Sequence, residues 1–423
     1  MSKQAACKLS LLFLLVTAIS SSLMFKPVEA AVSMSATIII RADGTVQPAG
    51  APIQWNAALD IFTLTNDITT SALTGIIIQK DDITLNGGGH TLQSATPGTL
   101  NGIKLTTHAR VTITAISITL FNTGITLSTS CSNCHITETS LSSNNYGIYL
   151  QASHHNTISG NNIAANTWAG IWLLGSQYND IIENSLSNHL SSNFGGIKLE
   201  QMSDYNNIVG NELTSNKYGI YVLDSRYNNI FHNNFVSNTP FQAYVTSLSS
   251  LPQPCTNSWD DGYPSGGNYW SDWSSLPDNK KGPSQNIDGA DGIVDSAYTI
   301  DASNIDHYPL KNPYGVYGLT INVDTTDGGT TNPTPGTYPH ATGSQVVVQA
   351  YPDSSFNFAR WEMETATSTE NPITVLVNRN LSLRAVFVPK IVIPVVPFGT
   401  LAVSLAMMLT LAGLAWFKRK PSS

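Results

Sequence analysis

The sequence predicts an all-β protein whose main part is a parallel β-helix. Six copies of the pattern Gly-Ile-x-(Leu/Val) recur at steps of 22, 23, 23, 26 and 23 residues. They begin at Gly102, Gly124, Gly147, Gly170, Gly196 and Gly219. A nearly constant period of this size indicates a solenoid with one coil of 22–23 residues per repeat. Apolar residues alternate with other residues at a period of two, which is typical of strands and not of helices.

Two asparagine registers recur in phase with these glycines. The first contains Asn156, Asn179, Asn206–Asn207 and Asn228. The second contains Asn161, Asn184, Asn211 and Asn233. Asparagine tolerates left-handed backbone conformations, and identical amides on successive coils, about 4.8 Å apart, can form hydrogen-bonded ladders. Each coil is therefore predicted to hold several short strands joined by turns, with the asparagines in a structural role.

Both ends of the chain carry targeting features. Two lysines precede an apolar stretch and a small-residue cleavage site, so residues 1–30 are predicted to be a secretory signal peptide. Residues 391–417 form an apolar run long enough to span a bilayer of about 30 Å. The basic residues of the tail, 418–423, are then cytoplasmic by the positive-inside rule. We expect a single-pass protein on the extracellular face of the membrane. A GPI-type signal is the alternative, but such a signal lacks a basic stop.

The composition fits an extracellular β-protein. Charged residues make up 11% of the 423 residues, with 28 acidic and 20 basic side chains and a net charge of −8. A nucleic-acid partner is excluded because it needs a basic face. One of the four cysteines lies in the predicted signal peptide, so an odd number remains and no disulfide framework is expected.

The rest of the chain divides by composition. Residues 31–251 are assigned to the parallel β-helix, whose N-terminal end needs a cap over its open strand edge. Residues 252–315 are rich in Trp, Asp, Gly and Pro and are predicted to be an irregular C-terminal cap. Residues 316–389 contain short alternating strands separated by turns, which indicates a small β-domain.

The central motifs resemble a known group of proteins. They are Gly-Ile-x-Leu, Asn-x-Ile, Ile38–Gly44, Asn268–Trp273, Asp291–Asp295 and Asp306–Leu310. They are similar to right-handed β-helix proteins of the NosD type, also described as carbohydrate-binding and sugar-hydrolysis repeats and common among archaeal surface proteins. The resemblance implies an extracytoplasmic location and often a polysaccharide partner. It implies no single reaction, because lyases, hydrolases, epimerases and adhesins share this fold.

The small β-domain resembles a second group. Its motifs are Gly328–Thr330, Pro335–Gly336, Phe358–Trp361 and Leu383–Phe387. They are similar to the bacterial repeat domain related to the internalin B-type B repeat. We interpret this domain as a spacer near the membrane.

One column of outward side chains is a candidate binding surface. The residue between the two buried positions of each repeat points outward. Down the solenoid this position holds Lys104, Thr126, Tyr149, Trp172, Lys198, Tyr221 and, in a degenerate seventh copy, Tyr244. Sugar rings stack their C–H faces on aromatic rings, so Tyr149, Trp172, Lys198, Tyr221 and Tyr244 are candidate glycan-binding residues. Stacking between coils for stability alone is the alternative.

A second column precedes the first asparagine register. It consists of His155, Tyr178, Tyr205 and Tyr227. Beside it, Asp204 and Arg226 fall on adjacent coils, where they can form a salt bridge. Alternatively, Arg226 can bind the carboxylate of a uronate.

Catalysis is an alternative function. A lyase needs a cation and a base beside the uronate, and Lys198, Tyr221 and Arg226 are the candidates. A hydrolase needs two carboxylates at a set separation. Glu200, on the same face as Lys198, can act with Asp204 or Asp224.

Cys131, Cys134 and His135 form a candidate metal site. Their spacing satisfies C-x-x-C-H, the pattern of c-type haem attachment. Two thiolates and one imidazole also suit copper or zinc, and the resemblance to NosD proteins adds to the copper interpretation. A buried thiol or a local disulfide is the alternative.

Asp288, Asp291 and Asp295 in the predicted cap are candidate Ca²⁺ ligands. Their spacing departs from an EF-hand loop, and an Asx-rich turn is the alternative. No other cofactor is indicated by the sequence.

We therefore expect a membrane-anchored surface protein that binds polysaccharide or cell-surface glycan through its aromatic column. The alternatives are a polysaccharide lyase or glycoside hydrolase, a structural envelope or adhesion protein, and an extracytoplasmic copper-binding protein of the NosD type.

Overall fold

The computed structural model describes residues 30–190, 194–248, 254–324, 328–341, 344–363, 366–377 and 381–390. All regular elements of the described residues are strands. The predicted transmembrane segment, the basic tail and residues 1–29 of the predicted signal peptide lie outside the described residues. The described part of the chain contains no helix long and apolar enough to cross a membrane. The chain forms two compact units, one that ends at Tyr314 and one that begins at Gly315.

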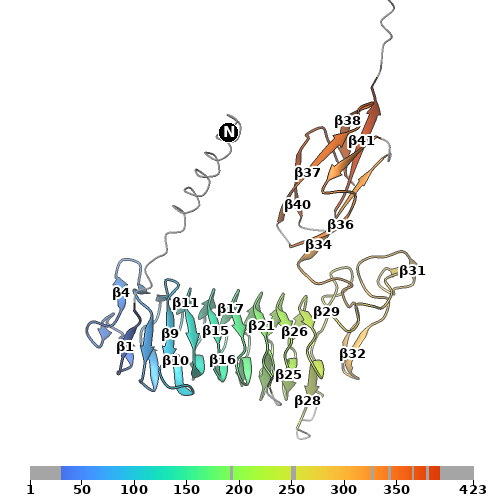
Figure 1. Cartoon of the computed structure of the whole chain (residues 1–423). Coiled ribbons are helices and arrows are strands. Elements are labelled where there is room, and N and C mark those ends of the chain that lie inside the picture. Colours follow the sequence, from blue (N-terminus) through green and yellow to red (C-terminus); the bar gives the residue numbers. More distant parts are fainter. Residues whose placement is uncertain are drawn as a thin grey trace, which may run out of the picture. The chain divides into compact units, whose positions relative to one another are not determined.

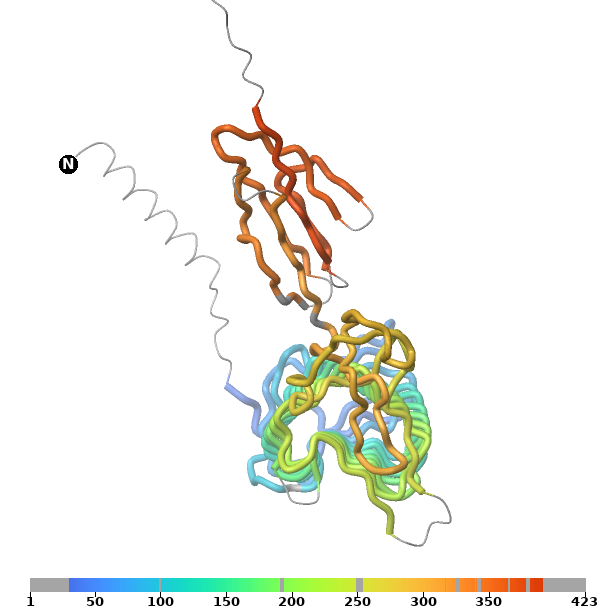
Figure 2. Tube along the Cα trace, turned by 90° about the vertical axis from the view of Figure 1, so that its right-hand side faces the viewer, coloured from blue at the N-terminus to red at the C-terminus, as the bar shows by residue number. Residues whose placement is uncertain are grey.

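The first unit is a parallel β-helix of the right-handed type (Figure 1). Each coil adds one strand to each of three sheets, and the coils lie over one another when viewed along the solenoid (Figure 2). The first sheet contains, in spatial order, β3 (Val46–Gln47), β2 (Ile38–Ile40), β7 (Thr74–Ile78), β10 (Thr99–Thr106), β13 (Phe121–Ser128), β16 (Tyr146–Gln151), β19 (Ala169–Leu174), β22 (Ile197–Glu200), β25 (Tyr218–Leu223) and β28 (Phe241–Thr246).

The other two sheets are built from shorter strands. The second sheet contains β4 (Ile53–Asn56), β5 (Ile61–Leu64), β8 (Thr84–Asn86), β11 (Thr112–Thr114), β14 (His135–Thr137), β17 (Thr157–Ser159), β20 (Asp180–Ile182), β23 (Asn207–Val209) and β26 (Asn229–Phe231). The third sheet contains β1 (Val32–Met34), β6 (Ile68–Thr70), β9 (Thr91–Ser94), β12 (Ser117–Thr119), β15 (Ser140–Ser142), β18 (Asn162–Ala164), β21 (Ser185–Ser187), β24 (Glu212–Thr214), β27 (Asn234–Val236) and β29 (Tyr269–Trp270).

The Gly-Ile-x-(Leu/Val) repeats form the first sheet, as predicted. Ile125 pairs with Ile103 on one side and with Ile148 on the other, so equivalent residues lie in register on successive coils. The degenerate copy forms β28 and places Tyr244 opposite Tyr221. The repeat pattern therefore sets the register of the solenoid.

The glycine of each repeat marks a close approach between coils. A Cβ atom on Gly147 would lie 2.5 Å from the carbonyl oxygen of Gly170 and 2.7 Å from Cγ2 of Ile163. Real Cβ atoms do not approach other atoms so closely, so only glycine fits without a backbone shift.

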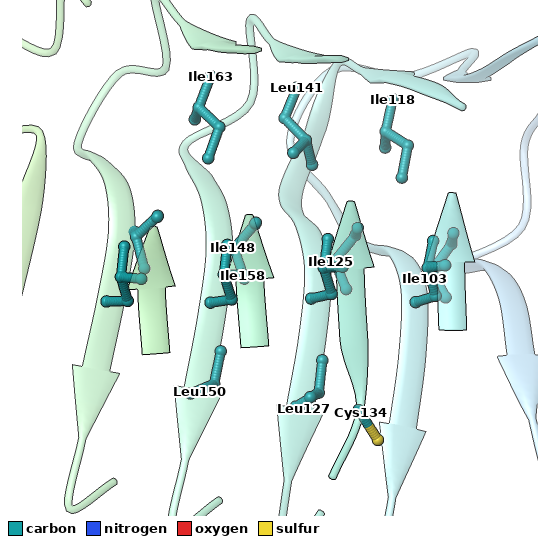
Figure 3. Packing of buried hydrophobic residues seen from close by; sticks show 14 of the residues in the cluster. Ile103, Ile118, Ile125, Leu127, Cys134, Leu141, Ile148, Leu150, Ile158 and Ile163 are labelled. Carbon is teal, nitrogen blue, oxygen red and sulfur yellow. The ribbon is translucent and has the colours of Figure 1, made fainter. Parts of the chain in front are cut away.

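Rows of aliphatic side chains fill the interior (Figure 3). Ile118, Leu141 and Ile163 of the third sheet form one row, and each is at most 1% exposed. Full burial of such a side chain contributes about 1.5–3 kcal/mol, which a single coil lacks the neighbours to achieve.

The predicted asparagine ladders are present. Oδ1 of Asn179 accepts hydrogen bonds from the backbone N (2.9 Å) and from Nδ2 (3.0 Å) of Asn156. The second register repeats this arrangement from Asn161 onward. A third ladder, which the sequence analysis missed, contains Asn144, Asn166, His189, Asn216, Asn238 and Gln242.

Both ends of the solenoid are covered. At the N-terminal end β4 pairs antiparallel with β5, and Trp55 stacks on Phe62 at 5.6 Å. At the C-terminal end Trp270 stacks on Phe235 at 4.4 Å, and Tyr298 stacks on Trp270 at 4.0 Å. The C-terminal segment has little regular structure beyond β29, β30 (Lys280–Lys281), β31 (Ile287–Asp288), β32 (Tyr298–Asp301) and β33 (Asn304–Asp306).

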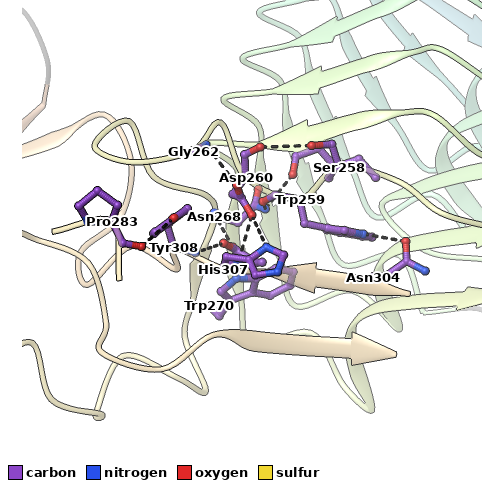
Figure 4. Close-up of polar contacts among 12 residues, drawn as sticks. Ser258, Trp259, Asp260, Gly262, Asn268, Trp270, Pro283, Asn304, His307 and Tyr308 are labelled. Carbon is purple, nitrogen blue, oxygen red and sulfur yellow. Dashed lines mark hydrogen bonds and ion pairs between the residues drawn. The ribbon is translucent and has the colours of Figure 1, made fainter. Parts of the chain in front are cut away.

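Asp306 ends the second asparagine ladder. Its Oδ2 accepts hydrogen bonds from the backbone N of Asn268 and from Nε1 of Trp270, both at 2.8 Å. Asn268 and Trp270 lie beside the pair formed by Asp260 and His307 (Figure 4). Burial raises the pKa of Asp306 to about 7, although its hydrogen bonds act in the opposite direction.

The second unit is a two-sheet β-domain. One sheet contains β36 (Gly336–Ala341), β34 (Val316–Val323), β41 (Leu381–Pro389), β38 (Phe356–Glu362) and β39 (Thr367–Ser368). The other contains β35 (Gly329–Asn332), β37 (Ser344–Pro352) and β40 (Ile373–Val377). Its core includes Leu319, Ile321 and Trp361, which are completely buried.

Candidate functional site

Aromatic side chains gather on the outer surface of the first sheet, over β16, β19, β25 and β28. We call this surface the aromatic face. It consists of Tyr146, Tyr149, Trp168, Trp172, Phe194, Tyr218, Tyr221, Phe241 and Tyr244. The rings of Tyr149 and Trp172 lie 4.6 Å apart and those of Tyr221 and Tyr244 lie 5.4 Å apart. The predicted column is therefore the middle of a wider aromatic surface.

Phe194 comes from the one coil that departs from the regular period. The step from Gly170 to Gly196 is 26 residues, and Phe194 lies in the extra length. Its ring centre is 5.5 Å from that of Trp172 and 5.5 Å from that of Tyr146. This insertion completes the first half of the face.

Lys198 joins the two halves and points outward as predicted, but its side chain is buried there, contrary to the predicted exposure. Only 5% of its surface is accessible, because its Nζ lies 4.3 Å from the ring centre of Phe194 and 5.3 Å from that of Tyr221. Oε2 of Glu200 pairs with Lys198 Nζ at 3.0 Å and accepts a hydrogen bond from Trp172 Nε1 at 3.0 Å. The lysine therefore holds the face together through cation–π contacts and an internal ion pair. Thr126, earlier in the same column, is also buried, and its hydroxyl bonds Asn101.

Three phenols of the face, those of Tyr146, Tyr149 and Tyr221, stay protonated and can donate hydrogen bonds. Burial raises the pKa of Tyr146 to about 12, and burial also raises the pKa of Tyr149 and Tyr221. The carboxylate of Glu200 adds to each of these shifts. Half-buried rings with hydroxyl groups offer both an apolar surface and polar contacts, which is what a sugar ring requires.

A hollow borders one edge of the face. It has a volume of about 390 Å³ and is lined by Trp168, Thr167, Leu190 and neighbouring residues. Trp168 is 37% exposed and Leu190 is 67% exposed. The edge of the face thus remains open to a ligand.

The catalytic candidates do not form one cluster. Lys198 and Glu200 pair with each other, and Lys198 contacts the ring of Tyr221. Arg226 lies at the corner between the first and second sheets, where its backbone N donates a hydrogen bond to Asp204 at 2.8 Å. This bond replaces the salt bridge expected between Asp204 and the Arg226 guanidinium.

The carboxylates considered for hydrolysis are also engaged separately. Asp224 accepts a hydrogen bond from the backbone N of Leu248 at 2.9 Å, and Asp204 is buried, which raises its pKa. Glu200 is held by Lys198 and Trp172. The arrangement offers no free pair of opposed carboxylates among these three side chains.

Cys131 and Cys134 are buried, reduced thiols, which agrees with the structural alternative. Sγ of Cys131 donates to the carbonyl of Ser128 at 3.3 Å, and Cys134 lies in the core among aliphatic side chains (Figure 3). Burial raises the pKa of Cys134 to about 11. His135 is exposed on the outer surface, so the three side chains do not converge.

The three aspartates of the C-terminal segment each have separate partners. Asp288 pairs with Lys280, Asp291 accepts from Gln285 and from backbone N atoms, and Asp295 accepts from the backbone N of Asn279. Among the described residues, no three His, Cys, Asp or Glu side chains are placed to hold a metal ion. The predicted calcium ligands therefore act as turn-stabilising acceptors.

Several residues of the aromatic face were not predicted. Tyr146, Tyr218 and Phe241 stand directly before the glycine position of their repeats, where the alternation alone does not predict an outward direction. Phe194 and Trp168 lie outside the strands. An aromatic residue before the glycine and the 26-residue step were the available signals.

The fold and its surface define a parallel β-helix protein with an outward aromatic face. Residues 63–275, half of the chain, match the family described as periplasmic copper-binding protein (NosD), and the chain belongs to this family. Residues 319–391 match the divergent InlB B-repeat domain. No protein of curated function matches the chain. The copper in the family's description does not fit the thiols and imidazole of Cys131, Cys134 and His135, because the thiols are buried and the imidazole faces outward.

Two solved structures are similar to part of this chain. A double mutant of the periplasmic alginate epimerase AlgG has a TM-score of 0.33 at 14% identity, with 53% of this chain and 60% of that chain covered. DFA-IIIase from Arthrobacter chlorophenolicus A6 in complex with GF2 has a TM-score of 0.29 at 11% identity, with 44% and 62% covered. The chain therefore spans less than two thirds of the chain in each of these two structures.

Proposed function

We propose that this protein binds polysaccharide or cell-surface glycan through the aromatic face. The observation that supports the proposal is the gathering of nine aromatic rings over adjacent coils, with neutral hydroxyls among them. A row of rings one coil apart suits a polymer that repeats, since each sugar can stack on one ring. Coil stacking alone would not require the insertion that brings Phe194 onto the face.

We further propose that the protein is secreted and anchored in the cell membrane by residues 391–417, with residues 31–251 as the β-helix, 252–315 as its cap and 316–389 as a spacer. This proposal rests on the apolar run and the basic residues after it.

The test is co-sedimentation of the purified protein with a panel of insoluble neutral and uronate-containing polysaccharides, with assay of the supernatant for released sugar. Binding predicts retention on at least one polymer without release. Sustained release of sugar would make the protein an enzyme, and retention on no polymer would support a structural envelope role.

A further inference from the structure

A second aromatic strip lies at the corner between the first and second sheets. It consists of His155, Tyr178, Tyr205 and Tyr227, one residue per coil, and shares no residue with the aromatic face. Ring centres of consecutive members are 5.1 Å apart, with interplanar angles of 6°, 6° and 20°. The three tyrosines are 47%, 45% and 51% exposed.

The backbone of this strip is strained. His155, Tyr178, Tyr205 and Tyr227 have φ angles of 57°, 56°, 57° and 61°, in the left-handed region that bulky residues rarely adopt. The preceding coil places Asn133 at the same corner with a φ of 52°. Asparagine tolerates this conformation, so the corner itself does not require tyrosine. Ring stacking offsets part of the strain but does not need hydroxyl groups.

The strip presents mainly ring edges and hydroxyls to solvent, because neighbouring rings cover the faces that they turn toward each other. Within the described part of the chain, the hydroxyls of Tyr178, Tyr205 and Tyr227 make no hydrogen bond. A polar row runs beside them at the start of β20, β23 and β26, where Asn229 bonds Asn207 and Asn207 bonds Asp180, each at 2.8 Å. The corner therefore carries two parallel rows of polar groups at the spacing of the coils.

We infer that this strip is a second binding site, which takes one extended chain of a neutral polysaccharide laid parallel to the solenoid axis. The sugar residues of extended polysaccharides with equatorial linkages follow one another at close to the coil spacing. One sugar residue per coil can therefore present hydroxyl groups to one tyrosine hydroxyl and one side chain of the polar row.

Other polymers fit less well. An extended peptide repeats about every 3.3 Å and does not match the 5.1 Å ring spacing. Single-stranded nucleic acid stacks its bases on successive open ring faces, whereas the rings of the strip stack on one another. A polyuronate would meet the carboxylate of Asp180 in the polar row, whose Oδ1 accepts a hydrogen bond from Asn207.

The test compares three variants with the parent protein for retention on insoluble cellulose, chitin and xylan. In one variant Tyr178, Tyr205 and Tyr227 are all replaced by Asn, and in the second all three are replaced by Phe. Tyr351→Ala, which removes a similarly exposed tyrosine of the second unit, is the matched control. The Asn variant should keep or raise the thermal midpoint, because the strain is relieved, and should lose retention about tenfold. The Phe variant keeps the stack and should also lose retention, because the hydroxyls are gone.

Retention of the Phe variant at the level of the control would overturn the inference, even if the Asn variant were poorly folded.

The result also separates this site from the aromatic face. If Trp172→Ala abolishes retention and both strip variants bind normally, the face is the binding site and the strip is not. If the strip variants lose retention and Trp172→Ala does not, the strip inference holds and the proposal for the aromatic face fails. A parent protein retained on none of the three polymers contradicts the strip inference as well.

Discussion

The two cysteines of the C-x-x-C-H motif occupy positions that hold serine and asparagine in the later coils. One coil after Cys131 and Cys134, the equivalent positions hold Ser153 and Asn156. The later coils keep this pair, with a serine at the first position and an asparagine three residues after it. Backbone N of Cys134 donates to Oδ1 of Asn156 at 3.0 Å, so Cys134 lies where the first asparagine ladder begins. The cysteines therefore take ladder positions of the coil.

Replacement of both cysteines by the residues of the next coil tests this interpretation. The double variant Cys131→Ser, Cys134→Asn should fold with a stability within about 1 kcal/mol of the parent, because each new side chain has the partners of its ladder. Its copper content after incubation with copper salt and desalting should equal that of the parent. A clear drop in bound copper would show that the thiols are metal ligands.

His189 makes the third ladder sensitive to acid. Its Nδ1 accepts a hydrogen bond from the backbone N of Asn166, its Nε2 bonds the carbonyl of Ile163, and burial lowers its pKa to about 4. The unfolded chain, with an ordinary histidine pKa of about 6.5, binds the proton first, so stability should fall as pH drops from about 6.5 to about 4.

His189→Asn restores the residue found elsewhere in that ladder and should reduce this pH dependence, measured as the thermal midpoint across the same range. His135→Asn, on the exposed surface, is the control and should leave the slope unchanged. An identical slope in the parent and in His189→Asn would contradict the assignment.

At the scale of the elements, the strands of the coils were predictable and much of the site was not. Alternation and the glycine period define the first sheet, because each repeat faces the same environment. The cation–π position of Lys198 was not predictable, since it depends on Phe194, which comes from an irregular turn. The third ladder was missed because His189 interrupts its asparagines.

The repeat glycines give a direct test of coil packing. Gly147→Ala should destabilise the protein by roughly 1–3 kcal/mol, because the new Cβ would overlap the carbonyl of Gly170. Gly160→Asn is the control, since no atom lies within 4 Å of the added Cβ and asparagine tolerates its φ of 64°. Chemical denaturation measures both variants. Equal stability of the two would show that the close approach is not what selects glycine.

The C-terminal cap should respond to pH in the opposite direction to the third ladder. The pKa of Asp306 is about 7 in the folded protein, above its ordinary value of 3.8, so the folded state holds the proton more tightly. The stabilisation is fully present below about pH 4 and is lost as pH rises to about 7. Asp306→Asn should reduce the dependence of the thermal midpoint on pH between these two values. A slope equal to that of the parent protein would contradict a titrating Asp306 in the cap.

At the scale of the whole molecule, the chain joins a parallel β-helix to a small β-domain and an apolar C-terminal run. We predict the domain order from composition, because the repeats, the Trp-rich cap and the short alternating strands differ in sequence. If residues 391–417 anchor the protein, a variant that ends at Lys390 should move from the membrane fraction to the soluble fraction of expressing cells. The full chain is the control, and membrane association of both forms would contradict the anchor.

The central claim is that the aromatic face binds glycan. Its most direct test measures retention on the polysaccharide that retains the parent protein. The variants Trp172→Ala and Tyr221→Ala are compared with the parent, and Tyr351→Ala is the control. Loss of a central ring should weaken retention about tenfold while the control binds normally. Unchanged retention of Trp172→Ala and Tyr221→Ala would contradict the claim and leave the face as a structural stack of rings.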